Sequence, residues 1–85
     1  MARIDDATLV ALVAGLAALP AERLEPDTPL ISSGLLDSFA MLELVAALEQ
    51  QGQLRIKPKD IHLRHLDSLA LLRGFLAKLD AYAPA

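Results

Sequence analysis

The sequence predicts an all-α fold, a small four-helix bundle with three main helices, one short helix and a long first loop. Leu and Ala supply 34 of the 85 residues while Val and Ile supply only 7, so helix formers greatly outnumber strand formers. Apolar residues also recur every three or four positions, which places them on one side of a helix. A chain of this length is expected to form one domain, residues 1–85.

Residues 5–19 are predicted to form the first helix. Asp5 and Asp6 are placed to cap its start, and Pro20 ends it. The apolar residues lie at offsets 0, 3, 4, 7 and 10, namely Leu9, Leu12, Val13, Leu16 and Leu19. This spacing indicates one buried stripe.

The stretch from 20 to 37 is predicted to be a long, ordered loop, because it is rich in Pro, Ser and Gly. A flexible linker would not need the five branched aliphatic residues found there, namely Leu24, Leu30, Ile31, Leu35 and Leu36. We therefore expect the loop to pack against the core. Gly34 is expected to supply a turn with positive φ.

Residues 38–51 are predicted to form the second main helix, with Gly52 as its stop. This helix has two apolar faces. One face contains Met41, Leu44, Val45 and Leu48, and the opposite face contains Phe39, Leu42 and Ala46. Since only one face can easily meet the core of so small a protein, the second face is either covered by the long loop or kept for a partner.

The remaining chain is predicted to contain a short helix at 60–64 and a last main helix at 67–80. Asp67 or Ser68 can cap the last helix. Its apolar stripe consists of Leu69, Leu72, Phe75, Leu76 and Leu79. We expect residues 83–85 to fray.

Composition and charge exclude several classes of function. A net charge of −3 argues against a nucleic-acid partner, because binding phosphates needs a basic surface. The absence of cysteine excludes a disulfide framework, a thiolate zinc site and a cysteine nucleophile. The longest charge-free run, 7–21, is too short to span a bilayer, and Asp5 and Asp6 stand where a signal peptide needs positive charge. We expect a cytoplasmic protein without membrane insertion.

The charge is unevenly distributed along the chain. Residues 1–53 contain two basic and eight acidic side chains, whereas residues 54–85 contain six basic and three acidic ones. The first part therefore has a net charge of −6 and the second a net charge of +3. The acidic part is the better surface for a basic partner.

Candidate catalytic and metal-binding residues are few. The only imidazoles are His62 and His65, and a zinc site built on them would also need Asp60 or Asp67. A self-contained enzyme would further need a cleft that so small a core can hardly provide. We expect no metal, no catalytic residue and no enzyme activity. A metal-dependent enzyme that uses the two histidines remains an alternative, ranked below the two that are described in the following paragraphs.

The segment from 34 to 49 contains the informative motif. Gly34 precedes Asp37-Ser38-Phe39, and the helix continues as Leu42-Glu43-Leu44-Val45. This segment resembles the acyl and peptidyl carrier proteins, in which an Asp-Ser-Leu motif opens the second helix. The resemblance extends over most of the chain, through Asp27-Thr28-Pro29-Leu30, Ile56, Asp60 and the stretch 69–76.

The resemblance implies that Ser38 is esterified by 4′-phosphopantetheine, which a phosphopantetheinyl transferase takes from coenzyme A. The arm would hold a cargo as a thioester, supplied by a ligase or acyltransferase and passed to downstream biosynthetic enzymes.

Asp37, Phe39 and Gly34 are the supporting motif residues. The residues expected to recognise partners are Phe39, Leu42, Glu43, Ala46 and, with lower rank, Met41. A phosphodiester at Ser38 would also lie at a helix N-terminus, where free N–H groups favour negative charge. We expect a monomer.

A second Asp-Ser pair, Asp67-Ser68, is followed by Leu69 and is literally closer to the family motif. Only 17 residues follow Ser68, which leaves no room for the remaining helices, and Arg73 stands where the family has Glu. We therefore expect Ser68 to be a helix cap.

The motif also indicates a subtype. Phe39 replaces the usual Leu, and Ala40, Gln50 and Gln51 stand where fatty-acid carriers are acidic. The chain is more similar to small stand-alone carriers of amino acids or unusual acyl units, such as the D-alanyl type. The alternative from another class is an unmodified helical adaptor that docks its second apolar face in a partner's groove.

Overall fold

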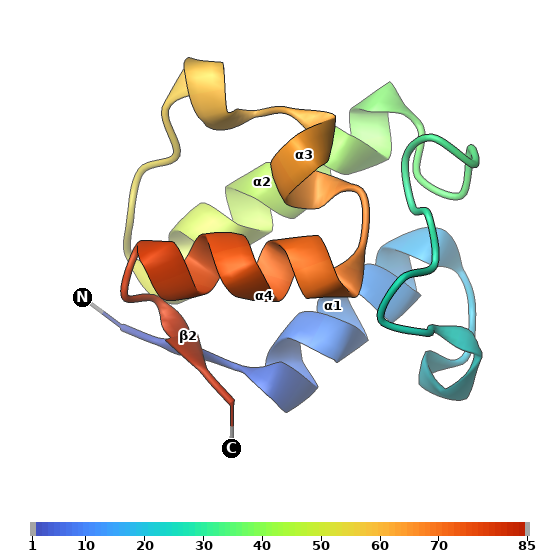
Figure 1. Ribbon diagram of the computed structural model, residues 1–85, viewed down its shortest axis with the longest axis horizontal. Helices are drawn as coiled ribbons and strands as arrows, with labels where there is room; N and C mark the ends of the chain where they lie inside the picture. The colour runs from blue at the N-terminus through green and yellow to red at the C-terminus, as the bar shows by residue number, and fades with distance from the viewer. Residues whose placement is uncertain (1, 85) are drawn as a thin grey trace.

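The computed structural model describes residues 2–84, and most of that part of the chain is helical (Figure 1). The predicted small helical bundle is confirmed. The α-helices are α1 (Asp6–Ala17), α2 (Ser38–Gly52), α3 (Leu63–Leu66) and α4 (Leu69–Lys78). Two 3₁₀ helices, η1 (Ala21–Arg23) and η2 (Pro58–Asp60), and two short strands, β1 (Ile4–Asp5) and β2 (Tyr82–Ala83), complete the described elements.

The first helix starts at its expected cap but is shorter than predicted. The carboxylate of Asp5 accepts a hydrogen bond from the backbone N–H of Thr8 at 2.7 Å. At the other end Ala18 adopts a left-handed backbone with φ 56°, and the N–H of Leu19 donates to the carbonyl of Ala14 at 3.1 Å. This closing bond wraps the chain back onto the last turn, so α1 ends before Leu19.

The predicted stop at Gly52 is wrong by one residue. Gly52 is the last helical residue of α2, and Gln53 takes the left-handed conformation with φ 50°. A Cβ at Gly52 would lie 2.8 Å from the side chain of Leu54. A larger residue at Gly52 would therefore require the Leu54 side chain to shift, whereas the backbone at Gly52 itself is not left-handed.

The short helix lies later than the predicted 60–64. Pro58 begins the separate 3₁₀ turn η2, since its fixed φ suits a first helical position. The chain then becomes extended at His62, whose Nδ1 accepts a hydrogen bond from the N–H of Arg64 at 3.2 Å. This cap starts α3 at Leu63.

The last helix is shorter at both ends than the predicted 67–80. The hydroxyl of Ser68 caps α4 by accepting from the N–H of Leu71 at 3.1 Å, so the helix begins at Leu69. Asp80 has a left-handed backbone with φ 55°, which stops the helix after Lys78. The cap role predicted for Ser68 is confirmed.

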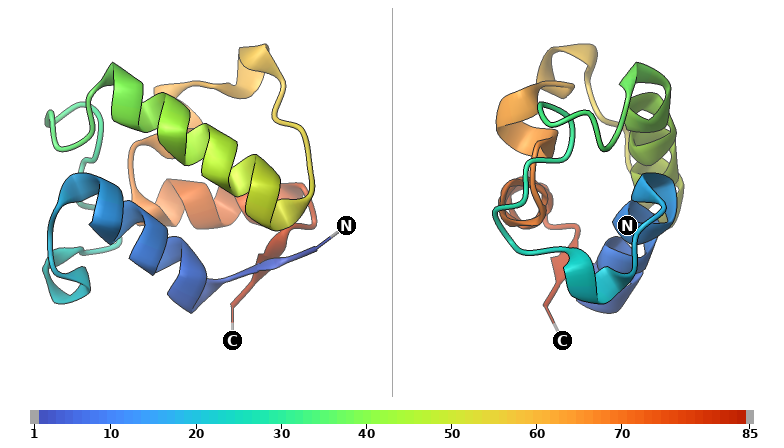
Figure 2. Two further views of the ribbon diagram at one scale, coloured as in Figure 1. Left: turned by 180° about the vertical axis from the view of Figure 1, so that it is seen from behind. Right: turned by 90° about the vertical axis from the view of Figure 1, so that its right-hand side faces the viewer.

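The core lies between α1, α2 and α4, and the long loop crosses one end of them (Figure 2). Loop residues Leu24, Leu30 and Leu36 are buried in that core, which confirms that the loop is packed. The largest fully buried side chains of the helices are Leu9, Val13, Leu44, Leu48, Leu66, Leu69, Leu72 and Leu76. The start of α2 is thus held by a loop that is itself part of the core.

Residues 4–5 and 82–83 form paired strands, so the expected fraying is wrong at Ala83. Strands β1 and β2 pair in parallel, with Ile4 opposite Tyr82 and Asp5 opposite Ala83. Asp6 accepts hydrogen bonds from Arg73 at 2.7 Å and from the Tyr82 hydroxyl at 2.7 Å. The hydrogen bond from Arg73 and, to a smaller extent, the one from Tyr82 lower the pKa of Asp6. Residue 85 lies outside the described residues.

Candidate functional site

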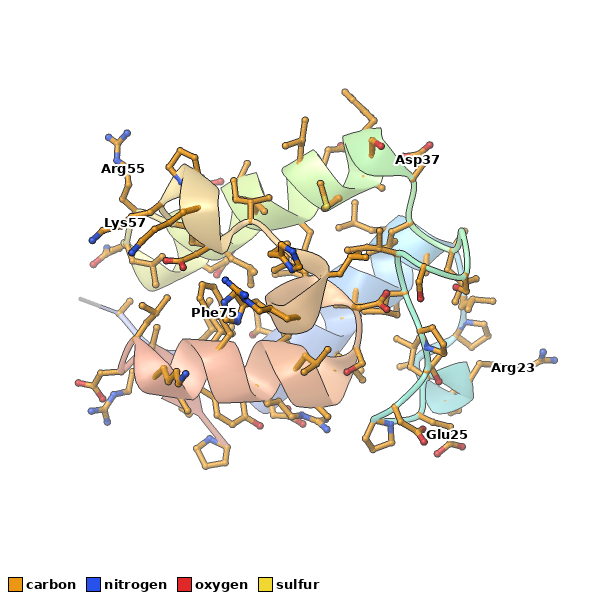
Figure 3. The ribbon with its side chains drawn as sticks, turned by 45° about the horizontal axis from the view of Figure 1, so that its top comes forward. Arg23, Glu25, Asp37, Arg55, Lys57 and Phe75 are labelled. Atoms are coloured by element: carbon orange, nitrogen blue, oxygen red, sulfur yellow. The ribbon has the colours of Figure 1, made fainter. Side chains whose placement is uncertain are left out.

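Ser38 is the first residue of α2 and is exposed. Figure 3 shows the preceding residue, Asp37, at the end of the bundle where the long loop meets α2. The residue before it supplies the cap, because Asp37 has an extended backbone and its Oδ1 accepts from the N–H of Ala40 at 2.8 Å. The hydroxyl of Ser38 makes no hydrogen bond within residues 2–84. It is therefore available as an attacking oxygen.

The first turn of α2 is suited to a phosphate group. The backbone N–H groups of Ser38 and Phe39 have no acceptor within the described chain, whereas the cap satisfies that of Ala40. Such groups lie at the positive end of the helix dipole, and α2 is 15 residues long. A phosphodiester on the Ser38 hydroxyl would meet donors that the fold itself leaves unused.

The loop fixes where α2 begins. Leu36, only 1% exposed, is buried two residues before Ser38, and its N–H donates to the carbonyl of Leu30 at 2.8 Å. Gly34 has φ +86°, as predicted, and its N–H donates to the carbonyl of Ile31 at 3.0 Å. Gly34 thus closes a turn whose positive φ would be strained for a residue with a side chain. Leu36 anchors the loop segment that leads to Ser38.

Asp67 ties this loop to the start of α4, a role that sequence reasoning missed. Its Oδ1 accepts from the N–H groups of Ile31 at 2.7 Å and Ser32 at 2.9 Å, and its Oδ2 accepts from the Ser32 hydroxyl at 2.7 Å. Its carbonyl also accepts from the N–H of Leu30 at 2.8 Å. The local sequence does not predict this contact, because the partners lie 35 and 36 residues away along the chain.

The ionisation of Asp67 depends on the same contacts. Partial burial opposes the carboxylate, but the hydrogen bonds from Ser32 and Ile31 outweigh it and lower the pKa of Asp67. The group is therefore charged at neutral pH and acts as a charge-assisted clamp on the loop.

One face of α2 remains uncovered beside Ser38. Phe39 is 69% exposed and Leu42 is 54% exposed, and Glu43 and Ala46 are exposed as well. These four residues lie at offsets 0, 3, 4 and 7, so they form one stripe along the helix. Met41 lies apart from them, because it is half-buried and packs against the core. The sequence left two alternatives for this face, namely cover by the long loop or use by a partner. The described residues of the long loop do not cover it.

The histidines have structural contacts. His62 caps α3, and the ring of His65 stacks on that of Phe75 with centroids 4.5 Å apart. Within residues 2–84, no group of three or more His, Cys, Asp or Glu side chains could hold a metal ion. No helix in this part of the chain is long and apolar enough to cross a membrane.

Comparison with known protein families gives one match. None of the curated proteins matches the chain. The family described as phosphopantetheine attachment site matches residues 7–73, from the first turn of α1 to the middle of α4. Domains of this family act as carriers of a covalently attached 4′-phosphopantetheine and are not catalysts themselves. The match covers most of the 85 residues, and the chain therefore belongs to the phosphopantetheine attachment site family.

Proposed function

We propose that Ser38 is the residue that receives the 4′-phosphopantetheine arm, in a discrete cytoplasmic carrier that holds its cargo as a thioester. One observation supports this assignment above the others. Ser38 is exposed at the first position of a long helix, and its hydroxyl is free because Asp37 caps that helix. Ser68, the only other serine at a helix start in the described chain, is 7% exposed and uses its hydroxyl as the cap.

The residues around Ser38 have separate roles in this proposal. Asp37 caps α2 and presents the serine to the phosphopantetheinyl transferase, while Gly34 closes the turn that positions both. Phe39, Leu42, Glu43 and Ala46 form the surface that the transferase and the cargo enzymes recognise. An exposed apolar stripe with a single acidic residue suits a partner groove that is apolar with a basic rim. Met41 contributes less, because it packs against the core.

The cargo of this carrier is proposed to be an amino acid or an unusual acyl unit, as in stand-alone aminoacyl or D-alanyl-type carriers. The motif Leu36-Asp37-Ser38-Phe39 and the uncharged residues Ala40, Gln50 and Gln51 support this subtype. A ligase or acyltransferase would load the thiol of the arm, and downstream biosynthetic enzymes would accept the thioester.

The test is modification of the purified chain with coenzyme A, magnesium and a promiscuous phosphopantetheinyl transferase. Intact-protein mass spectrometry and peptide mapping are expected to find one phosphopantetheine group, on Ser38. Ser38→Ala is expected to remain unmodified, and the matched control Ser68→Ala to be modified like the wild type. An adduct on Ser38→Ala, or no adduct on folded wild-type protein with several transferases, would reject the assignment.

The alternative is an unmodified adaptor that binds through its uncovered α2 face. The large exposures of Phe39 and Leu42 favour binding at this face whether or not Ser38 is modified. An adaptor would bind its partner equally well as wild type and as Ser38→Ala, and would lose binding with Phe39→Ala. A carrier would bind its cargo enzymes productively only after modification.

A further inference from the structure

A second uncovered feature lies between α3 and α4, away from Ser38. It is an open pocket of about 290 Å³, and no residue of α2 lines it. Figure 3 shows Phe75 on the side of α4 that faces α3. The residues that line the pocket include Arg64, His65, Leu71, Gly74, Phe75 and Lys78.

The inner surface of the pocket is largely apolar. Phe75 is buried and stacks on His65, with an angle of 24° between the rings. Leu71 remains 41% exposed and borders the opening. An aliphatic or aromatic side chain inserted here would gain contact with Leu71 and with the stacked rings.

Gly74 keeps the pocket open. A Cβ built on Gly74 would have no heavy atom within 4 Å, so the packing of the bundle does not require glycine at this position. Glycine inside a helix is less favourable than alanine, because it loses more backbone freedom on folding. The fold thus carries a destabilising residue whose visible effect is to leave room between the two helices.

The rim of the pocket is basic. Arg64 of α3 and Lys78 of α4 are both exposed, and neither belongs to an ion pair within residues 2–84. The two ion pairs described there use Arg3 and Arg73 instead. None of the lining residues is acidic, and residues 54–85, which include the pocket, have a net charge of +3. The pocket is therefore complementary to negative charge, unlike the α2 face with its Glu43.

We infer that this pocket is a docking site for an acidic amphipathic segment of a partner protein. One apolar side chain of the segment would enter between Leu71 and Phe75, and its carboxylates would pair with Arg64 and Lys78. The small volume and the open shape suit a single anchoring side chain better than an enclosed small molecule. The inference does not rest on modification of Ser38, because the two sites share no residue.

The test is an amide NMR titration of the full chain with a defined probe. The probe is a blocked peptide with one tryptophan flanked by four glutamates, and its matched controls replace the tryptophan with serine or the glutamates with lysines. Amide shifts are expected at Leu71, Gly74 and their neighbours on α3 and α4, with none at Ser38 and none with either control peptide.

Two variants and one matched control decide whether the pocket is the site. Gly74→Leu fills the pocket, and Arg64→Glu combined with Lys78→Glu reverses its rim, so each is expected to weaken binding about tenfold or more. Arg55→Glu combined with Lys57→Glu makes the same charge change beyond the far end of α2, where both side chains point outward, and is expected to leave binding unchanged (Figure 3). Unchanged far-UV circular dichroism and thermal midpoints establish that the variants are folded.

Several results would overturn the inference. Equal loss with the Arg55 and Lys57 control would mean general charge attraction, and wild-type affinity in folded Gly74→Leu would mean that the pocket is not used. Shifts in this pocket that depend on protein concentration without peptide would mean that a second copy occupies it. Binding to anionic phospholipid vesicles, but not to the peptide, would assign the basic rim to a membrane surface.

Discussion

The chain contains the dipeptide Asp-Ser at the start of two helices, and the two copies are used in opposite ways. At α2 the aspartate caps the helix and the serine hydroxyl is free, whereas at α4 the serine caps and the aspartate reaches back to the long loop. Ser38 is exposed and Ser68 is buried. A shift of one residue in the cap position therefore separates an exposed serine with a free hydroxyl from a buried serine that caps a helix.

The surroundings of the two pairs explain the shift. Asp67 faces the N–H groups of Ile31 and Ser32, which need an acceptor where the loop crosses the start of α4. With its carboxylate occupied there, only Ser68 remains to cap α4. Within residues 2–84 no such loop donors bond to Asp37, which caps its own helix and leaves the Ser38 hydroxyl unused. The difference is thus set by contacts distant in sequence.

The largest effect on stability is expected for Asp67→Ala. Removing the carboxylate leaves the N–H groups of Ile31 and Ser32 without their acceptor, so the free energy of unfolding should fall by about 2 kcal/mol or more. Asp37→Ala removes one cap bond and should cost about 1 kcal/mol. Urea unfolding of both variants measures the difference, and equal losses would contradict the clamp.

The clamp also predicts a dependence on pH. Because the folded pKa of Asp67 is lowered, its stabilisation is complete above about 3.8, the ordinary value for Asp, and is lost as pH falls through the folded value. The destabilisation by Asp67→Asn at pH 7 should therefore shrink as the pH is lowered towards 2. A constant difference over this range would mean that the charge of Asp67 contributes nothing.

A smaller effect is expected for the two serines. Ser68→Ala removes the cap of α4 and should lower the free energy of unfolding by about 1 kcal/mol. Ser38→Ala removes no hydrogen bond and should change it by less than about 0.5 kcal/mol. Urea unfolding of both variants in the unmodified form provides the check. A larger loss in Ser38→Ala than in Ser68→Ala would reverse the roles assigned here.

The smallest effect on stability is expected for Asp37→Asn. Asparagine caps a helix about as well as aspartate, so the free energy of unfolding should change by only a few tenths of a kcal/mol. The rate at which the transferase modifies Ser38 then reports on the charge alone. A slower rate with unchanged stability would show that the transferase uses the carboxylate of Asp37, and an unchanged rate would limit Asp37 to capping.

Local sequence predicted those parts of the fold that depend on neighbouring residues. The apolar spacing located α1, α2 and α4, and the buried aliphatic residues of the loop were expected to pack inward. The contacts of Asp67 and the position of α3 were not predictable, because they depend on loop donors far along the chain and on where Pro58 and His62 interrupt the backbone. The uncovered α2 face was anticipated as one of two alternatives, whereas the pocket at Gly74 gave no signal in the sequence.

The parallel pairing of β1 with β2 also has a mechanical consequence. The two strands lie side by side at one edge of the bundle, away from the start of α2 (Figure 1). Because the strands run in the same direction, a force that pulls residues 2 and 84 apart acts along the strands, in shear. The contacts between them would then be loaded together and not opened one after another. The strand pair, the Arg3–Asp80 ion pair and the hydrogen bonds of Asp6 would resist this force first. The force would reach α2, which begins with Ser38, only after these contacts had broken.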